Sequence, residues 1–406
     1  MNGEKTDKAE KFHLINDNTC VRLKLYGEDV RTMLKDNGWR EAEMAAADYI
    51  FINTCAFLQK AENRAMAKIE GIVRNKKSHQ QVAVFGCLPS INEARLRNIH
   101  RGRIFSGRNL DAIATAFGLK RRDAPISHQI SRQGSLLTDF SKCLNRIFWQ
   151  DAYFTYLYDK GRVFHLKISE GCLGRCSYCA ERLARGSLTS RKIEDIVREF
   201  KRGLSLGYGI FSFNADDTGF FGLDNNENIV GLLREILAIR ENFKLMITEF
   251  NPAALVSFSP DIIPLLSSPK IAFVTVPLQS GSRRILSLMN RDYEVDEAIA
   301  ILKEIKGGNE KLKINTHIIV GFPGETEEDF RQTSRLLLDK FHFDKVKIFR
   351  YSERPNTAAA GLPDKISEET KKERRKSLNR RIILRAIRDL NLKEFLLNFH
   401  NLFWGV

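Results

Sequence analysis

Three cysteines lie close together on one short stretch of the chain, and they constrain the fold more than any other feature. Cys172, Cys176 and Cys179 are separated by three and two residues, and Tyr178 directly precedes the last of them. The apolar residues 163–168 come before them and predict a strand that ends just ahead of the thiols. Three thiolates on one loop can bind three irons of a cubane iron–sulfur cluster. The remaining iron would then be open to another ligand.

A structural zinc site is the simpler alternative for such a loop. Zinc sites of this kind need four ligands, commonly two Cys-x-x-Cys pairs or one such pair with histidines. This stretch offers one pair and one further cysteine, and no histidine follows nearby. The spacing therefore favours a cluster with an open iron. A zinc-stabilised, non-catalytic RNA-binding protein stays as a second hypothesis.

Composition limits the class of protein. The 406 residues are 43% apolar and 28% charged, which predicts two or three domains with a sizeable core. No apolar stretch has the length of a membrane span, and the polar residues 1–11 do not resemble a signal peptide. We therefore expect a cytoplasmic protein whose seven cysteines serve metal binding or catalysis. The formal net charge of +15 favours a polyanionic partner such as nucleic acid, although a generally basic surface would give the same charge.

The first third of the chain alternates between strand-like and helix-like segments, which predicts a small α/β domain with a parallel sheet. Strands are expected at residues 12–15, 49–52, 82–85 and 104–105, and helices at residues 28–37, 59–74, from 92 onward and at 109–117. Cys20, Cys55 and Cys87 each follow one of the first three strands. Because open α/β sheets bind ligands at the carboxyl ends of their strands, these thiols should gather at one edge. We interpret them as a second cluster site, although any one of them alone would be an ordinary buried cysteine.

Six βα units follow from residue 163 onward. Strands are expected at residues 163–168, 210–214, 244–249, 271–276, 312–320 and 345–351, with helices at residues 192–207, 228–242, 260–266, 295–306 and 327–340. Six such units predict a partial barrel, since a full one has eight, and place the site at the carboxyl ends of the strands. The predicted fold class is therefore α/β, with an N-terminal parallel-sheet domain, a partial (β/α)6 barrel and a helical C-terminal tail.

We expect four regions along the chain. Residues 1–119 would form the N-terminal domain, 120–161 a linker, 162–370 the barrel, and 371–406 a basic helix with an aromatic tail. Residues 371–388 hold nine Lys or Arg and one acid, with apolar residues at helical spacing. This pattern favours an amphipathic helix that closes the barrel over a dedicated RNA contact. Cys143 in the linker is interpreted as an ordinary thiol.

The three-cysteine loop resembles the radical SAM signature, including the aromatic residue before the last cysteine. Further motifs are similar to those of the methylthiotransferases within that superfamily, and the resemblance covers about residues 12–378. These motifs are Asn53-Thr54-Cys55, Gly86-Cys87, Arg185-Gly186, Ser190-Arg191, and residues 277–282, 289–291, 319–326 and 351–358. Together they are far more specific than the cysteine loop alone.

The resemblance implies two 4Fe–4S clusters and S-adenosylmethionine as cofactors, with a cellular electron donor. The radical-generating cluster would be bound by Cys172, Cys176 and Cys179. The auxiliary cluster would be bound by Cys20, Cys55 and Cys87. One S-adenosylmethionine would methylate the sulfur on the auxiliary cluster, and a second would supply the radical, so that a methylthio group replaces an unactivated C–H. The residues expected near S-adenosylmethionine are Tyr178, Asp216, Glu249, Gln279, Ser280, Arg291, Gly321 and Gly324.

The chain departs from this family in several places. Residues 21–26 lack the Asn and Asp-Ser-Glu that usually follow the first cysteine, and His317 stands where an acid is common. The C-terminal β-barrel module, which helps the family to grip RNA or a ribosomal protein, is missing. Residues 167–172 and 217–224 resemble the branch that modifies an aspartate of a ribosomal protein, whereas residues 279–282 and 351–355 resemble the branch that modifies a tRNA adenosine next to the anticodon.

The missing module favours a peptide or protein side chain, or another substrate outside the two usual ones. A tRNA adenosine is the alternative, which the charge of +15 supports. A radical SAM enzyme without sulfur insertion is a further alternative. For the two cysteine sets to act together, the linker must fold the N-terminal domain over the mouth of the barrel. The sequence says nothing of the oligomeric state.

Overall fold

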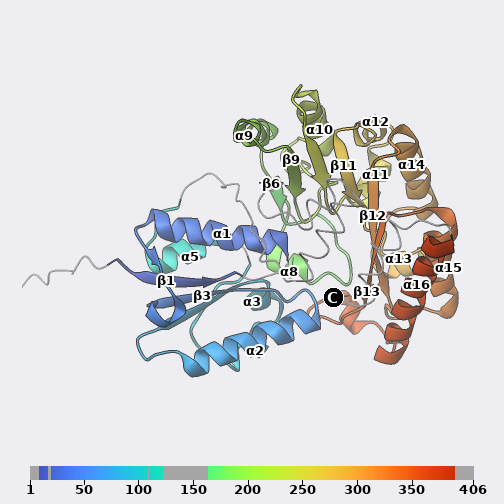
Figure 1. Ribbon diagram of the computed structural model, residues 1–406. Helices are drawn as coiled ribbons and strands as arrows, with labels where there is room; N and C mark the ends of the chain where they lie inside the picture. The colour runs from blue at the N-terminus through green and yellow to red at the C-terminus, as the bar shows by residue number, and fades with distance from the viewer. Residues whose placement is uncertain (1–8, 17–19, 108, 122–162, 389–406) are drawn as a thin grey trace, which may run out of the picture. The chain divides into compact units, whose positions relative to one another are not determined.

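The computed structural model describes residues 9–16, 20–107, 109–121 and 163–388 (Figure 1). These residues form two compact units. The first unit combines the described residues among the first 128 with two short segments from far along the chain, Cys179–Gly186 and Arg354–Asn356. The second unit holds the other described residues. The predicted linker, Cys143 and the aromatic tail lie outside the described residues, and the four predicted regions stay a prediction.

The first unit is built on a parallel five-stranded sheet in the order β2-β1-β3-β4-β5. Its strands are β1 (Lys11–Ile15), β2 (Arg40–Glu41), β3 (Tyr49–Thr54), β4 (Gln81–Gly86) and β5 (Arg103–Ile104). Helices α1 (Val21–Asp36) and α5 (Leu110–Phe117) share an apolar core with one face of the sheet. Helices α2 (Gln59–Asn75), α3 (Cys87–Ile91) and α4 (Glu93–Arg97) share a core with the other face. Two covered faces explain why β3 and β4 are almost continuously apolar.

Helix α1 begins at Val21, so the predicted helix was too short at its amino end. Gly27 lowers the helix propensity there, but packing requires it, because a Cβ would lie 2.3 Å from Cγ of Asn16. Asn53 donates from Nδ2 to Oδ1 of Asn16 at 2.8 Å and to the Leu23 carbonyl at 2.7 Å. These hydrogen bonds tie the start of α1 to the end of β3.

The second unit contains a parallel sheet of six strands that follow one another in chain order. They are β6 (Val163–Lys167), β9 (Ile210–Asn214), β10 (Lys244–Ile247), β11 (Ile271–Thr275), β12 (Lys313–Val320) and β13 (Lys345–Arg350). The connecting helices include α9 (Ile193–Ser205), α10 (Ile229–Ala238), α12 (Ile262–Leu266), α14 (Val295–Gly308) and α15 (Glu327–Arg335), and they cover one side of the sheet (Figure 1). The predicted α/β fold class with its two parallel sheets is confirmed.

Several short elements were not predicted. Among them are the helices α11 (Pro252–Ser257) and α13 (Arg283–Leu288), and the antiparallel pair of β7 (Ser169–Glu170) with β8 (Thr189–Ser190). Elements of two to six residues are too short for a helical or strand period to stand out from the surrounding sequence.

The two faces of the six-stranded sheet differ in polarity because side chains alternate along each strand. Phe211, Phe213 and Ile314 belong to the large apolar core of this unit. Ser212 alternates with the two phenylalanines, and Asn315 follows Ile314, and both are buried although polar. A polar inner face of this kind is suited to a polar ligand at the carboxyl ends of the strands.

Helix α16 (Glu368–Arg388) is the last described element, and it packs against β12 and β13. Leu378 is fully buried, whereas Lys372, Lys376 and Arg380 are exposed. The helix is therefore amphipathic, as predicted, and begins slightly earlier than expected. Within the described ranges, no helix combines the length and the apolar character needed to cross a bilayer.

Candidate cluster-binding sites

The loop that carries Cys172, Cys176 and Cys179 is called the radical loop below. Its middle is fastened by the segment that follows α13. The Ser177 N–H donates to the Met289 carbonyl at 2.9 Å, and Asn290 Nδ2 donates to the Arg175 carbonyl at 2.8 Å. Residues 289–291, which resemble a family motif, thus stabilise the radical loop through hydrogen bonds to its backbone.

The thiols of Cys172 and Cys176 both lie next to Gly174. A Cβ at this glycine would lie 3.1 Å from the Cys172 sulfur and 3.8 Å from the Cys176 sulfur. The Gly174 N–H also donates to the Cys172 sulfur at 3.1 Å, which suits a thiolate. The absence of a side chain at Gly174 therefore leaves a space beside the two sulfurs that any larger residue would fill. The open space and the paired sulfurs fit two corners of a cluster.

A carboxyl group and a guanidinium lie beside these thiols. The Cys172 thiol donates to Asp217 Oδ2 at 3.5 Å, and Asn251 Nδ2 donates to the same oxygen at 2.7 Å. Burial raises the pKa of Asp217, although Asn251 and Arg291 act in the opposite direction. Arg291 donates from Nη1 to the Cys176 sulfur at 3.6 Å. Arg291, predicted to contact S-adenosylmethionine, thus lies against a candidate cluster ligand, and the predictions had missed Asn251.

Two predicted contacts of S-adenosylmethionine have left-handed backbone conformations. The φ angles are 54° at Glu249, just after β10, and 69° at Gln279, a few residues after β11. Such conformations cost about 1–3 kcal/mol in non-glycine residues and concentrate at functional sites. The Gln279 N–H donates to the His317 carbonyl at 2.8 Å, while Glu249 Oε2 lies 3.9 Å from Nδ1 of His317. Both residues occupy the predicted end of the sheet.

Three other predicted contacts are engaged within the fold. Asp216 Oδ2 accepts a hydrogen bond from the Gly171 N–H at 2.9 Å. Ser280 is fully buried, and its Oγ accepts from the Ser282 N–H at 3.1 Å. Tyr178 is partly buried against the apolar core of the second unit. Asp216 and Ser280 therefore shape loops, and a direct contact with S-adenosylmethionine stays a prediction for all three.

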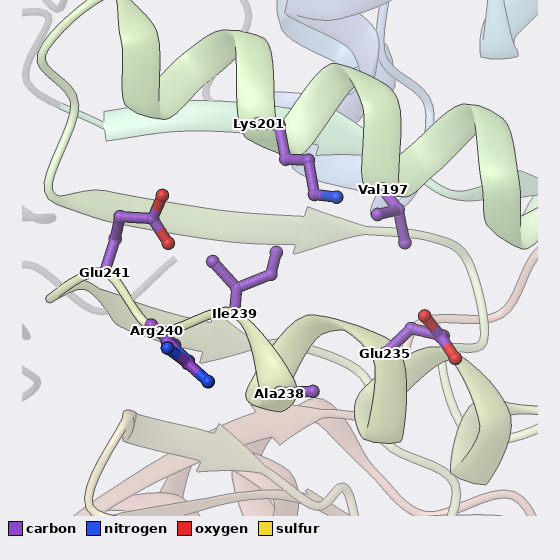
Figure 2. Close-up of a pocket in the computed structure, with 7 residues that line it drawn as sticks. All are labelled: Val197, Lys201, Glu235, Ala238, Ile239, Arg240 and Glu241. Carbon is purple, nitrogen blue, oxygen red and sulfur yellow. The ribbon is translucent and has the colours of Figure 1, made fainter.

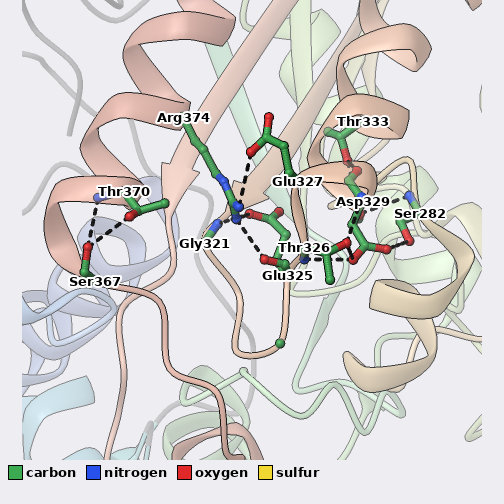
Figure 3. Close-up of polar contacts among 12 residues, drawn as sticks. Ser282, Gly321, Glu325, Thr326, Glu327, Asp329, Thr333, Ser367, Thr370 and Arg374 are labelled. Atoms are coloured by element: carbon green, nitrogen blue, oxygen red, sulfur yellow. Dashed lines mark hydrogen bonds and ion pairs between the residues drawn. The ribbon is translucent and has the colours of Figure 1, made fainter.

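The loop of Gly321 and Gly324 is organised by a buried ion pair (Figure 3). Gly321 has a φ of 72°, and a Cβ there would lie 2.3 Å from Cγ of Lys371, so glycine is required. Its N–H donates to Glu325 Oε2 at 2.7 Å, and Arg374 of α16 pairs with the same carboxylate. Burial raises the pKa of Glu325, although both partners oppose the shift. The sequence patterns did not reveal this pair, since its members lie far apart along the chain.

The remaining three sequence-predicted ligands, called the auxiliary cysteines below, follow three adjacent strands. Cys20 lies between β1 and α1, Cys55 comes directly after β3, and Cys87 is the first residue of α3 after β4. Gly86 has a φ of 99°, and a Cβ there would lie 2.5 Å from the Thr54 carbonyl oxygen. Glycine thus permits the close approach of β3 and β4 at the point where two of the thiols emerge.

The auxiliary thiols influence one another electrostatically. Burial raises the pKa of Cys55 to about 12, with further contributions from Cys87 and Cys20. Burial also acts to raise the pKa of Cys20, but Arg22 and Arg185 outweigh it and hold this pKa below its ordinary value. Three cysteine thiols that lie this close to one another are a donor set suited to an iron–sulfur cluster, because thiolates are its usual ligands.

In the parts of the chain that the structure describes, no three His, Cys, Asp or Glu side chains gather closely enough to bind a single metal ion. A cubane cluster requires a wider arrangement, because each thiolate binds a different iron. Both cysteine sets offer thiol ligands suited to an iron–sulfur cluster. The radical loop also has space for a cluster, because Gly174 carries no side chain beside the Cys172 and Cys176 sulfurs.

Figure 2 shows a hollow on the outside of the second unit. Its lining comes from α9, from the end of α10 and from the segment that leads into β10, so it marks the side where β10 begins. The cysteines follow strand ends instead. The lining residues are Val197, Lys201, Glu235, Ala238, Ile239, Arg240 and Glu241.

Comparisons with known proteins agree with this arrangement. Residues 166–337 match the radical SAM superfamily, and residues 19–107 match the uncharacterized protein family UPF0004. The chain is 32% identical to the probable threonylcarbamoyladenosine tRNA methylthiotransferase of Pyrococcus horikoshii, over 84% of this chain and 77% of that protein. It is 28% identical to the ribosomal protein uS12 methylthiotransferase RimO of Chlamydia pneumoniae, over 91% of this chain and 76% of that protein.

A solved structure shares the fold. The radical S-adenosylmethionine methyltransferase TsrM from Kitasatospora setae, with bound cobalamin and a 4Fe–4S cluster, aligns with a TM-score of 0.61. The alignment covers 87% of this chain and 77% of that one at 15% identity. At this identity the likeness shows the fold alone.

Proposed function

We propose that this chain, which belongs to the radical SAM methylthiotransferase family, methylthiolates an adenosine of tRNA. The observation that supports tRNA as the substrate is the 32% identity to the Pyrococcus horikoshii protein, whose name specifies threonylcarbamoyladenosine in tRNA. The relative named for a ribosomal protein is 28% identical. These similarities favour the tRNA alternative over the peptide or protein side chain that was expected from the sequence.

Enzymes of this family use two 4Fe–4S clusters and S-adenosylmethionine. We assign the radical-generating cluster to the radical loop and the auxiliary cluster to the auxiliary cysteines. When bound, these cofactors supply the radical, the sulfur and the methyl group. The chain's own part is to hold and orient them. The Gly174 N–H and the Arg291 guanidinium donate to thiol sulfurs, and such donors steady the ligands and favour their thiolate form.

The exposed side of α16 supports a polyanionic substrate. Lys372, Lys376 and Arg380 are spaced four residues apart, so they form one stripe along the helix. Arg375 lies between them in sequence, and burial together with the nearby charge of Arg350 lowers its pKa. Crowded like charges gain from a phosphate partner, because binding neutralises them and releases counterions from the RNA.

The substrate is tested with anaerobically reconstituted enzyme, S-adenosylmethionine and a reductant. Three substrates are compared, namely tRNA with threonylcarbamoyladenosine, the same tRNA without that modification, and a peptide from the ribosomal protein. Mass spectrometry of nucleosides and peptides should find the methylthio group on the threonylcarbamoyladenosine alone. A methylthiolated peptide with unchanged tRNA would refute the proposal.

The RNA contact is tested separately by neutralising the stripe with K372Q, K376Q and R380Q in one variant. If each residue contacts one phosphate, the slope of log K against log salt should fall by about one per residue removed. The control variant, K201Q/K303Q/K311Q, removes three exposed lysines from elsewhere in the second unit and should keep the wild-type slope. Equal slopes in all three proteins would place the RNA contact away from α16.

A further inference from the structure

Helix α8 (Glu181–Arg185) begins two residues after Cys179, the last cysteine of the radical loop, yet it belongs to the compact unit of the auxiliary cysteines. Ala180 and Ala184 are buried in the same apolar core as Cys87 of that unit. A Cβ at Gly107 would lie only 2.9 Å from the Ala184 carbonyl oxygen, which shows how tightly this helix is packed. A segment of the radical SAM sequence region thus lines the auxiliary site.

The helix brings a buried charge to that site. The Arg185 side chain is 1% exposed, and it donates from Nη2 to Glu181 Oε1 at 2.8 Å and to the Cys20 sulfur at 3.9 Å. Arg22 lies 3.7 Å from the other oxygen of Glu181. Two guanidiniums therefore lie close to this carboxylate beside the Cys20 thiol. A guanidinium that donates to a ligand sulfur favours the thiolate form and counters the negative charge of a thiolate-ligated cluster.

We propose that Arg185, held by Glu181, is a positioning residue of the auxiliary cluster. It donates a hydrogen bond to the Cys20 sulfur and offsets the negative charge of the cluster, which grows on reduction. This inference rests on the assignment of a cluster to the auxiliary cysteines. The competing explanation is an ordinary ion pair within α8, since Glu181 and Arg185 are four residues apart. An ion pair of that kind would affect stability but not the properties of the cluster.

The test uses the full chain with Cys172, Cys176 and Cys179 replaced by Ala, so that bound iron reports the auxiliary cluster alone. R185Q is introduced into this background and compared with R182Q, which removes an exposed arginine of the same helix. The midpoint potential is measured by a redox titration followed by electron paramagnetic resonance. The loss of iron to a chelator is measured in the same samples.

R185Q should shift the midpoint to a more negative potential, because the reduced cluster loses a stabilising positive charge. Iron should be lost about tenfold more readily, since removal of a partner of a metal ligand commonly weakens metal binding about 10- to 100-fold. R185K, which keeps the charge, should recover most of the potential, and R182Q should match the background. A folded R185Q with unchanged potential and chelation would overturn the proposal.

E181Q keeps the proposal testable if R185Q does not fold. Removing this carboxylate should shift the midpoint to a more positive potential, and an unchanged midpoint would refute the role of the pair. The background variant checks the underlying assignment independently. If it binds no iron, the auxiliary cluster itself is wrong, whereas bound iron with unmoved potentials would reject the role of Arg185 alone.

Discussion

The radical loop and the auxiliary cysteines reach their places by different routes. The radical loop holds its three cysteines within eight positions of the chain, and its backbone sets the Cys172 and Cys176 sulfurs next to Gly174. The auxiliary cysteines are more than thirty positions apart and meet only because β1, β3 and β4 are neighbours in one sheet. The first arrangement depends on local loop geometry, and the second depends on the packing of a whole domain.

The chemical surroundings of the two sets differ in the same sense. Next to the radical loop, a backbone N–H and Arg291 donate to sulfur, and Asp217 lies beside Cys172. Among the auxiliary cysteines, burial raises the pKa of Cys55 to about 12. The positively charged Arg185 of helix α8 donates to the Cys20 sulfur. A site assembled from distant segments should therefore be more sensitive to changes in the fold around it.

The largest expected effect comes from removing either set of thiols. Replacing the auxiliary cysteines with Ala should lower the iron content from about eight to about four, because one cubane is lost. Cleavage of S-adenosylmethionine should persist, but no methylthio product should form. Replacing the cysteines of the radical loop should abolish both reactions. Iron counts and product analysis check this, and four irons in the wild type as well as in the auxiliary variant would contradict two clusters.

The next effect concerns stability of the first unit. Arg354, from a segment far along the chain, pairs with Glu62 of α2, and their side chains are 2% and 0% exposed. Arg354→Met should cost up to about 3–5 kcal/mol of unfolding free energy, because the buried Glu62 carboxylate loses one of its two arginine partners. Arg74→Met, which breaks an exposed pair on the same helix, should cost less than about 1 kcal/mol. Chemical denaturation measures the unfolding free energy of both variants. Equal losses would show that the buried pair of Arg354 and Glu62 stabilises the protein no more than the exposed pair does.

The same pair predicts a dependence on pH. Burial tends to raise the pKa of Glu62, but hydrogen bonds from Arg354 and Arg95 bring it below its ordinary value. The pKa is therefore lower in the folded than in the unfolded chain, where it is about 4.3. The resulting stabilisation is complete above the unfolded pKa and is lost as the pH falls through the folded value. Arg354→Met should flatten this acid limb of the stability curve, and an unchanged limb would refute the link.

Gly86 tests the dependence of the auxiliary cysteines on sheet packing. Gly86→Ala forces a side chain to a φ of 99° and against the Thr54 carbonyl, which should cost at least about 1–3 kcal/mol and displace Cys87. Gly118→Ala is the control, since it shares a positive φ but meets no neighbour. Iron content and thermal unfolding are measured together. A Gly86 variant with full iron would show that the close approach of β3 and β4 is dispensable.

The smallest expected effect lies in the radical loop. Gly174→Ala places a Cβ 3.1 Å from the Cys172 sulfur, which a single loop can relieve by a local shift. We expect a partial loss of iron in the auxiliary-cysteine-free background, with little change in unfolding temperature. Gly209→Ala, at an open position of the same unit, should keep full iron. A loss of stability as large as that of Gly86→Ala would break the contrast between the two sites.

Most strands could be predicted from the sequence because each is a short apolar run between polar turns. The predictions were poorer where packing overrides local preference. Gly27 concealed about the first two turns of α1, because glycine lowers helix propensity and is needed there for the space that it leaves for Asn16. The short helices α11 and α13 carried too little pattern to be recognised, although α13 leads into the segment that fastens the radical loop.

The sequence by itself determined the family, the radical loop and the candidate auxiliary cysteines, because thiol spacing and position after strands are local properties. Only the tertiary structure decided which groups surround those thiols. Arg185 lies 165 positions from Cys20, and Arg354 lies 292 positions from Glu62. Contacts over such separations follow from strand order and helix packing, and no local pattern in the chain records them. The charge that balances a buried site is therefore visible only after the chain has folded.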